Sequence, residues 1–198
     1  MASSQLLPAA CSVAPKEWAV VIQAMGDGRQ IVMVRKGGLV EPSGGFSFQS
    51  DVFLLYPTFE HQAVQYALPE YQSLSPKLAA ERREGWLRLA YAGRLEASIE
   101  THDGEALKRL RDLHVYTDGM ITQRLRWQPQ QPLVIGCVRV FRLREPWELP
   151  MRDAYAGCKS WVDLGTEASL GGAEPVLSDA AFAQRLEAFK RGLQTPAS

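Results

Sequence analysis

The clearest structural signal in the chain is the stretch Leu87-Arg-Leu-Ala-Tyr-Ala-Gly-Arg-Leu-Glu-Ala-Ser-Ile99. Its apolar side chains recur with a period of two, and they are Leu87, Leu89, Tyr91, Leu95, Ala97 and Ile99. A period of two places alternate residues on opposite faces of a β-strand, whereas a helix needs a period of 3.6. The stretch therefore predicts a long strand with one face in the core and the other toward water.

Further strands are predicted on both sides of this stretch. Residues 133–143 are almost continuously apolar, which is typical of a strand covered on both faces, so we expect this strand near the centre of the sheet. Residues 18–25 and 30–35 are β-rich runs separated by Gly-Asp-Gly, which predicts a hairpin. Two shorter strands are predicted at residues 53–56, before Pro57, and at residues 158–164.

Capping residues and prolines predict the helices. The expected helices run from Thr58 to Leu68 before Pro69, from Ser75 to about residue 84, from residue 103 to about 113, from residue 118 to about 127, and from Ser178 onward. Strands and helices cluster rather than alternate strictly. This order favours an α+β fold whose sheet is mixed or largely antiparallel, either open or barrel-like, with flanking helices.

Length and composition indicate one ordinary domain. We expect a disordered leader over residues 1–15, a single α+β domain over residues 16–194 and a flexible tail over residues 195–198. Three cysteines without a paired spacing suit reduced thiols in the cytoplasm, and no segment is apolar enough to cross a membrane. The 22 basic and 22 acidic residues balance, which argues against binding by bulk charge alone.

The familiar catalytic and cofactor signatures are absent from the sequence. Gly157-Cys-Lys-Ser160 lacks the glycines of a phosphate loop. No lysine follows an acid by two positions, as in restriction-type nucleases, and the histidines and cysteines lack zinc spacing. We therefore assign no catalytic residue, no metal and no cofactor, and the sequence leaves open whether the protein is an enzyme.

Two short motifs are candidates for binding an anion. Arg35-Lys36-Gly37-Gly38 combines two cations with a flexible turn, which suits phosphate, although a polar strand end has the same composition. His61 and Gln62 lie at an expected helix start, where the helix dipole favours a neutral imidazole. The alternative is that Thr58 and His61 only satisfy free backbone amides.

Two further motifs are candidates for contacting nucleic acid. His114 precedes an expected helix that carries Arg124 and Arg126, although the two arginines point to different sides of that helix. Lys159 and Trp161 could bind a phosphate and stack a base, whereas a tryptophan in such a pattern more often fills a core edge. Residues 103–144 carry eight Lys or Arg against four Asp or Glu, which indicates a basic segment.

Several segments together resemble the uncharacterised bacterial family known as domain of unknown function 1802. They are Trp18 to Gly38, the Phe-Leu-Leu-Tyr-Pro-Thr-Phe-Glu-His-Gln stretch from Phe53, His-Val-Tyr-Thr from His114, and Gly-Cys-Lys-Ser-Trp from Gly157. The resemblance covers about residues 16–165. It implies no established activity, and it implies an association with restriction-modification systems.

The leading hypothesis is an accessory domain that binds nucleic acid or another phosphate-bearing ligand. Arg35, Lys36, Arg124 and Arg126 would bind phosphates, while His61 and His114 would orient their neighbours. One alternative is a small hydrolase or transferase whose site gathers His61, His114 and Arg35. The other is a protein-interaction module. No membrane partner is expected, and the sequence leaves a protein partner open.

Overall fold

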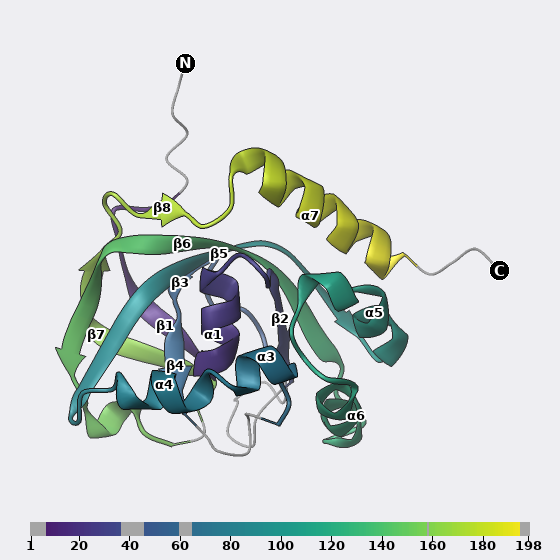
Figure 1. Ribbon diagram of the computed structural model, residues 1–198, viewed down its shortest axis with the longest axis horizontal. Coiled ribbons are helices and arrows are strands. Elements are labelled where there is room, and N and C mark those ends of the chain that lie inside the picture. Colours follow the sequence, from purple (N-terminus) through teal and green to yellow (C-terminus); the bar gives the residue numbers. More distant parts are fainter. Residues whose placement is uncertain (1–6, 37–45, 60–64, 158, 195–198) are drawn as a thin grey trace.

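Two long antiparallel strands, β5 (Trp86–Thr101) and β6 (Leu133–Pro150), form the frame of the computed structural model and arch across it in Figure 1. The structure describes residues 7–36, 46–59, 65–157 and 159–194. Both long strands were predicted from the sequence. The first nine residues of β6 are buried on both faces, and β6 lies between β5 and a further strand, so its predicted central place is confirmed.

Two open sheets make up the β part of the fold. The larger sheet is antiparallel, has the order β2-β6-β5-β3, and contains β2 (Val32–Arg35), β3 (Val52–Leu54) and the short β8 (Glu174–Pro175) beside β6. The smaller sheet has the order β4-β1-β7, with β4 (Tyr56–Thr58) parallel and β7 (Trp161–Ser169) antiparallel to β1 (Ala10–Trp18). The α+β class with mixed and antiparallel sheets is confirmed, and the sheets do not close into a barrel.

The predicted hairpin over residues 18–35 is wrong in its first half. Ala19–Gly26 forms a helix, α1, in which Val20, Val21, Ile22, Ala24, Met25 and Gly26 are buried. A short apolar run fits a buried strand and a buried helix equally well, because a helix covered on nearly all sides shows no polar face. In Figure 1 α1 lies within the curve of β5 and β6, which explains why its residues are apolar apart from Gln23.

The predicted leader is also wrong for residues 10–15, which form the first part of β1. Ala10 pairs with Ser169 and Pro15 pairs with Trp161, so this segment forms the part of β1 that pairs with β7. The mixture of small, apolar and polar residues suggested disorder, but pairing with a neighbouring strand orders the segment. Residues 1–6 and 195–198 lie outside the described part of the chain.

The segment around Pro57 differs from prediction because the chain changes sheets there. β3 ends at Leu54 and β4 begins at Tyr56, so a single residue, Leu55, separates strands of different sheets. Thr58 belongs to β4, where its hydroxyl donates to the Glu17 carbonyl, while Pro69 begins a helix, α3 (Pro69–Gln72), instead of ending one. Residues 60–64 of the predicted helix lie outside the described residues.

The remaining predicted helices are confirmed with shorter bounds. They are α4 (Ser75–Ala80), α5 (Gly104–Arg109) with a 3₁₀ turn over Arg111–Leu113, α6 (Asp118–Arg126) and α7 (Asp179–Leu193). Side chains of Asp103, Thr117 and Ser178 accept hydrogen bonds from backbone amides at three of the helix starts. Figure 1 shows α7 along the outer side of β6, where it buries Phe182 and Phe189.

Two hydrophobic clusters hold these elements together. The larger cluster joins α1, the first half of β6, α5, α6 and α7, and the smaller joins β1, β7 and the apolar face of β5 and β6 around Leu89 and Phe141. Within the described residues, no helix is both long enough and apolar enough to span a membrane.

Candidate functional site

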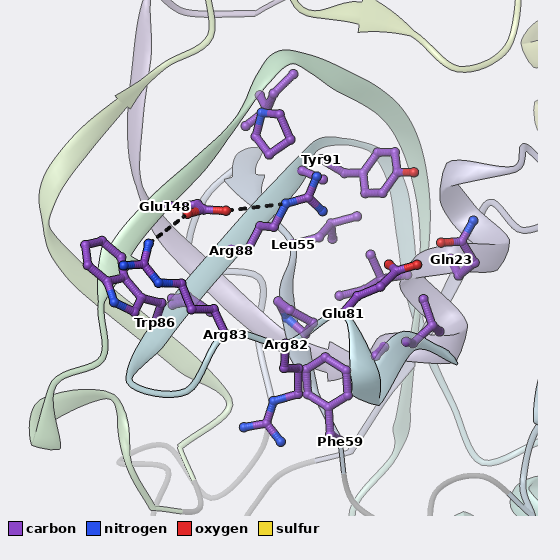
Figure 2. Close-up of a pocket in the computed structure, with 18 of the residues that line it drawn as sticks. Gln23, Leu55, Phe59, Glu81, Arg82, Arg83, Trp86, Arg88, Tyr91 and Glu148 are labelled. Atoms are coloured by element: carbon purple, nitrogen blue, oxygen red, sulfur yellow. Dashed lines mark ion pairs between the residues drawn. The ribbon is translucent and has the colours of Figure 1, made fainter. Parts of the chain in front are cut away.

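An arginine-rich cleft of about 460 Å³ opens between the strands β5 and β6 and the helices α1 and α4 (Figure 2). Its walls come from β5, from β6, from the turn after α4 and from α1, and its floor comes from the β3–β4 segment around Leu55. Five arginines line it, namely Arg82, Arg83, Arg88, Arg142 and Arg144. We call this feature the arginine cleft.

Strand geometry explains why arginines from distant parts of the sequence meet here. Arg88 lies between the buried Leu87 and Leu89 on β5, and Arg142 and Arg144 flank the buried Leu143 on β6. Alternate residues of a strand face opposite sides, so burial of the leucines turns the arginines outward. The antiparallel pairing of β5 with β6 then brings the two outward sets onto one face.

The described lining of the arginine cleft carries an excess of three positive charges, because two carboxylates within it, Glu81 and Glu148, accompany its five arginines. Glu148 lies 3.7 Å from guanidinium nitrogens of both Arg83 and Arg88, as the dashed lines in Figure 2 show. Arg82 and Arg144 form no ion pair with any other described residue. A concave surface with one sign of charge concentrates ligands of the opposite sign.

Aromatic rings lie against three of the arginines. The guanidinium carbon of Arg83 is 4.1 Å from the ring centroid of Trp86, and that of Arg82 is 4.6 Å from the ring centroid of Phe59. The guanidinium of Arg142 lies 5.0 Å from the Tyr91 ring. Such cation–π contacts hold a guanidinium plane in a fixed orientation. Trp86 and Phe59 are half-buried, so parts of their rings face the arginine cleft.

Arg142 is fixed further by hydrogen bonds to two other elements. One of its terminal nitrogens donates to the Tyr91 hydroxyl at 2.9 Å, and the other donates to the carbonyl oxygen of Gly26 at 3.1 Å. Gly26 is the last residue of α1, so a single guanidinium joins β6, β5 and α1. These hydrogen bonds therefore fix the position of the Arg142 guanidinium in the arginine cleft.

Arg35 and Lys36, predicted to bind phosphate, have internal partners. Arg35 donates to the Lys16 carbonyl at 2.7 Å and lies 3.7 Å from the buried carboxylate of Glu17, whose pKa is raised by burial and lowered in part by Arg35. The Lys36 ammonium donates to the carbonyls of Arg124 and Leu125 near the end of α6. Burial lowers the pKa of Lys36, whose residue is 5% exposed. Both cations stabilise the fold through these contacts within the protein.

His114 is fully buried and lies outside the arginine cleft. Its Nε2 is 2.9 Å from the Leu107 carbonyl, and its Nδ1 accepts a hydrogen bond from the Tyr116 amide. Burial lowers the pKa of His114 to about 4. Both ring nitrogens are occupied, so His114 has no atom left for the shared site of the predicted hydrolase or transferase.

The other predicted site residues divide into core, helix-end and surface positions. Trp161 is a core residue that stacks with Phe46 and donates to the Ser47 carbonyl, as the alternative interpretation of its motif expected. The guanidinium of Arg124 lies 5.6 Å from the Trp18 ring, whereas Arg126 and Lys159 are exposed. Gly37, Gly38, His61 and Gln62 lie outside the described residues. None of the predicted site residues that the structure describes lines the arginine cleft.

The sequence analysis did not identify the residues that line the arginine cleft as candidate site residues. The two-residue alternation of residues 87–99 already predicted that Arg88 faces water, and Arg142 and Arg144 lie within the basic segment 103–144. The missing information was the pairing of β5 with β6, which places Arg88 opposite Glu148 and Tyr91 opposite Arg142. Within the described part of the chain, no group of three or more His, Cys, Asp or Glu is placed to bind a metal ion.

Comparison with known proteins gives one family and a set of distant structures. A family model described as Domain of unknown function (DUF1802) matches residues 14–188. No curated protein matches the chain. The chain is similar to the crystal structure of ASCH from Zymomonas mobilis, with 12% identity, coverage of 88% of this chain and 92% of that chain, and a TM-score of 0.46. Two mutants of the same protein match with 11% and 12% identity, coverage of 88% of this chain and 95% and 93% of theirs, and TM-scores of 0.45 and 0.41.

Proposed function

Since the chain belongs to the DUF1802 family, whose description names no activity, we propose a function from its own site: the arginine cleft binds nucleic acid. The observation that carries the proposal is the set of five arginines in one cavity, three of them stacked on aromatic rings. The guanidinium group matches the geometry of a phosphate, which it binds through two parallel hydrogen bonds.

The aromatic residues favour nucleic acid over a simple inorganic anion. Trp86 and Phe59 present parts of their rings to the arginine cleft, and every nucleobase has a face that stacks on such a ring. Phosphate and base are the two groups that repeat along a nucleic acid, and cations with aromatics are their matching partners. The zero net charge of the chain is consistent with a local binding surface.

The proposal keeps the predicted accessory role and changes the residues that perform it. Arg82, Arg83, Arg88 and Arg144 replace Arg35 and Lys36 as phosphate ligands, because the latter two have internal partners. A link to restriction-modification, implied by the resemblance of the sequence, stays a prediction. Contact with nucleic acid is the property that such a role would need.

Fluorescence anisotropy with labelled single-stranded and duplex DNA and RNA, across a salt series, tests the proposal. We expect saturable binding that weakens steeply with salt, because bound phosphates release counterions. Arg144→Ala should weaken binding about tenfold or more and reduce the salt slope by about one, since it removes one charged hydrogen-bonding group.

Two exposed arginines outside the arginine cleft provide matched controls. Arg191→Ala on α7 and Arg126→Ala on α6 remove the same charge, and we expect both variants to bind as the wild-type protein does. Equal losses in all three variants would show that binding depends on diffuse charge. Binding that does not change with salt would reject the proposal.

A further inference from the structure

A second hollow of about 450 Å³ lies beside the arginine cleft. Four described residues line both cavities, namely Pro57, Phe59, Arg82 and Met151. The guanidinium of Arg82 lies over the Phe59 ring, so this stacked pair stands at the boundary between the two spaces. Because these residues line both cavities, the two cavities are adjacent.

The described lining of the second hollow, like that of the arginine cleft, contains more cations than carboxylates. Among the described lining residues its cations are Lys16, whose ammonium donates to the Gly157 carbonyl at 2.8 Å, Arg82 and Arg152, and its carboxylate is that of Asp153. Arg152 is exposed, and its guanidinium passes over Gly165, where a Cβ would lie 3.3 Å from the nearest nitrogen. The hollow therefore offers positive charge on the side away from Arg88 and Arg144, which line only the first cavity.

The neutral polar groups of the second hollow are engaged with the protein. The Tyr155 hydroxyl donates to the Leu164 carbonyl at 2.8 Å, and the Tyr56 hydroxyl lies 3.4 Å from the sulfur of Met151. Met151 is 42% exposed and provides an apolar surface at the shared boundary. Beside the Asp153 carboxylate, the described lining thus offers the exposed guanidinium of Arg152 and apolar surface, which suits phosphates and base faces.

We infer that the two cavities form one continuous groove that holds an unpaired nucleic-acid strand, with phosphates on both sides of the Phe59–Arg82 boundary. The inference rests on the proposed function and names the form of its ligand. Each cavity has the size of a small-molecule pocket, so it suits a single nucleotide rather than a helix. Bases in a duplex are stacked on one another and cannot reach Phe59 or Trp86, whereas unpaired bases can.

The test compares ligands of increasing length on the full-length protein. Uridine monophosphate, a uridine trinucleotide and a uridine hexanucleotide are titrated by calorimetry, with a hexamer duplex of the same backbone as the fourth ligand. We expect the hexanucleotide to bind at least about tenfold more tightly than the monophosphate, because a second subsite acts at high effective concentration once the first is filled.

Two arginine variants separate the cavities. Arg152→Ala should weaken hexanucleotide binding about tenfold and leave the monophosphate affinity unchanged, since Arg152 lines only the second hollow. Arg144→Ala, in the arginine cleft alone, should weaken both ligands. Thermal melting of each variant checks the fold, and Arg152→Lys, which keeps the charge, should restore most of the lost affinity.

The outcomes distinguish this inference from the proposed function. Absence of binding by all four ligands would overturn both. Binding of the monophosphate without a gain from length, equal hexanucleotide affinity in Arg152→Ala and wild type, or tighter binding of the duplex than of the strand would overturn the groove and leave the arginine cleft as a nucleotide site.

Discussion

The phenol ring of Tyr91 occupies the space that a side chain on Gly26 would fill. An ideal Cβ on Gly26 would lie 2.3 Å from Tyr91 Cζ and 2.4 Å from its hydroxyl oxygen. That hydroxyl accepts a hydrogen bond from Arg142, which also donates to the Gly26 carbonyl. The end of α1 therefore determines where a cleft arginine lies, although Gly26 itself carries no functional group.

Gly26→Ala should displace Tyr91 and disturb the contacts of Arg142. The new methyl group overlaps a buried ring, and overpacking of this kind costs roughly 1–3 kcal/mol of stability. We expect a lower free energy of unfolding in urea and weaker binding of oligonucleotides. Gly119→Ala on α6 is the matched control, because the nearest atom to its Cβ would be 3.7 Å away. Equal effects of the two substitutions would contradict the role of the Gly26–Tyr91 contact.

Glu148→Gln should strengthen the binding of phosphate-bearing ligands. The carboxylate lies 3.7 Å from both Arg83 and Arg88, so its neutralisation frees two exposed cations. Exposed ion pairs are worth up to about 1 kcal/mol each, which corresponds to a gain in affinity of about two- to fivefold. Anisotropy at low salt measures the change.

Glu145→Gln removes the same charge from β6 but lies outside the arginine cleft, so it serves as the control for Glu148→Gln. We expect its affinity to match that of the wild type. An equal gain in both variants would mean that total charge, and not the release of Arg83 and Arg88, sets the affinity.

Lys36→Met should lower stability and leave ligand affinity unchanged. Its ammonium donates to two carbonyls near the end of α6, at 2.8 and 3.3 Å, and these acceptors lose their partner in the variant. The expected cost is roughly 1–2 kcal/mol in the free energy of unfolding. A large loss of oligonucleotide affinity in a folded Lys36→Met protein would instead restore Lys36 as a phosphate ligand.

His114 should make the protein less stable in acid. Its pKa is about 4 in the folded chain because of burial, against an ordinary value of 6.5. Between these values the unfolded chain binds a proton that the folded chain does not, so the free energy of unfolding falls as the pH falls through this window. The loss between pH 7 and pH 5 should be about 2 kcal/mol.

Urea unfolding of wild type and His114→Gln at pH 7 and pH 5 measures this contribution. The variant keeps a donor for Leu107 but does not titrate in this range, so its stability should fall less between the two pH values, even where its stability at pH 7 is lower. Equal decreases in the two proteins would show that other groups cause the acid sensitivity.

The sequence correctly predicted the elements whose residue pattern is compatible with only one type of secondary structure. The two-residue period of β5 excludes a helix, and the helix starts at Asp103 and Ser178 are local features that do not depend on the rest of the fold. Residues 19–26 have no such feature. A run of eight residues that is apolar apart from Gln23 suits either a helix or a strand, and its position within the curve of the sheet decides between them.

The site was harder to predict because it depends on strand pairing. Arg35 with Lys36 is conspicuous as a local motif, yet Arg35 has its partners in β1 and Lys36 has its partners near the end of α6. Arg88 and Arg142 are 54 positions apart and became neighbours through the register of β5 and β6, which includes a shift between Leu89 and Tyr91. Local composition does not encode that register.

The single residue between β3 and β4 has a consequence for ligand binding. The Leu55 amide donates a hydrogen bond to the Tyr91 carbonyl at 2.9 Å, and Leu55 lines the arginine cleft. The residue that forms the floor of the site is therefore also the covalent link between the two sheets. The two sheets cannot separate at this point unless the hydrogen bond between Leu55 and β5 breaks. The floor is thus preorganised, and a ligand that enters loses little affinity to ordering the protein beneath it.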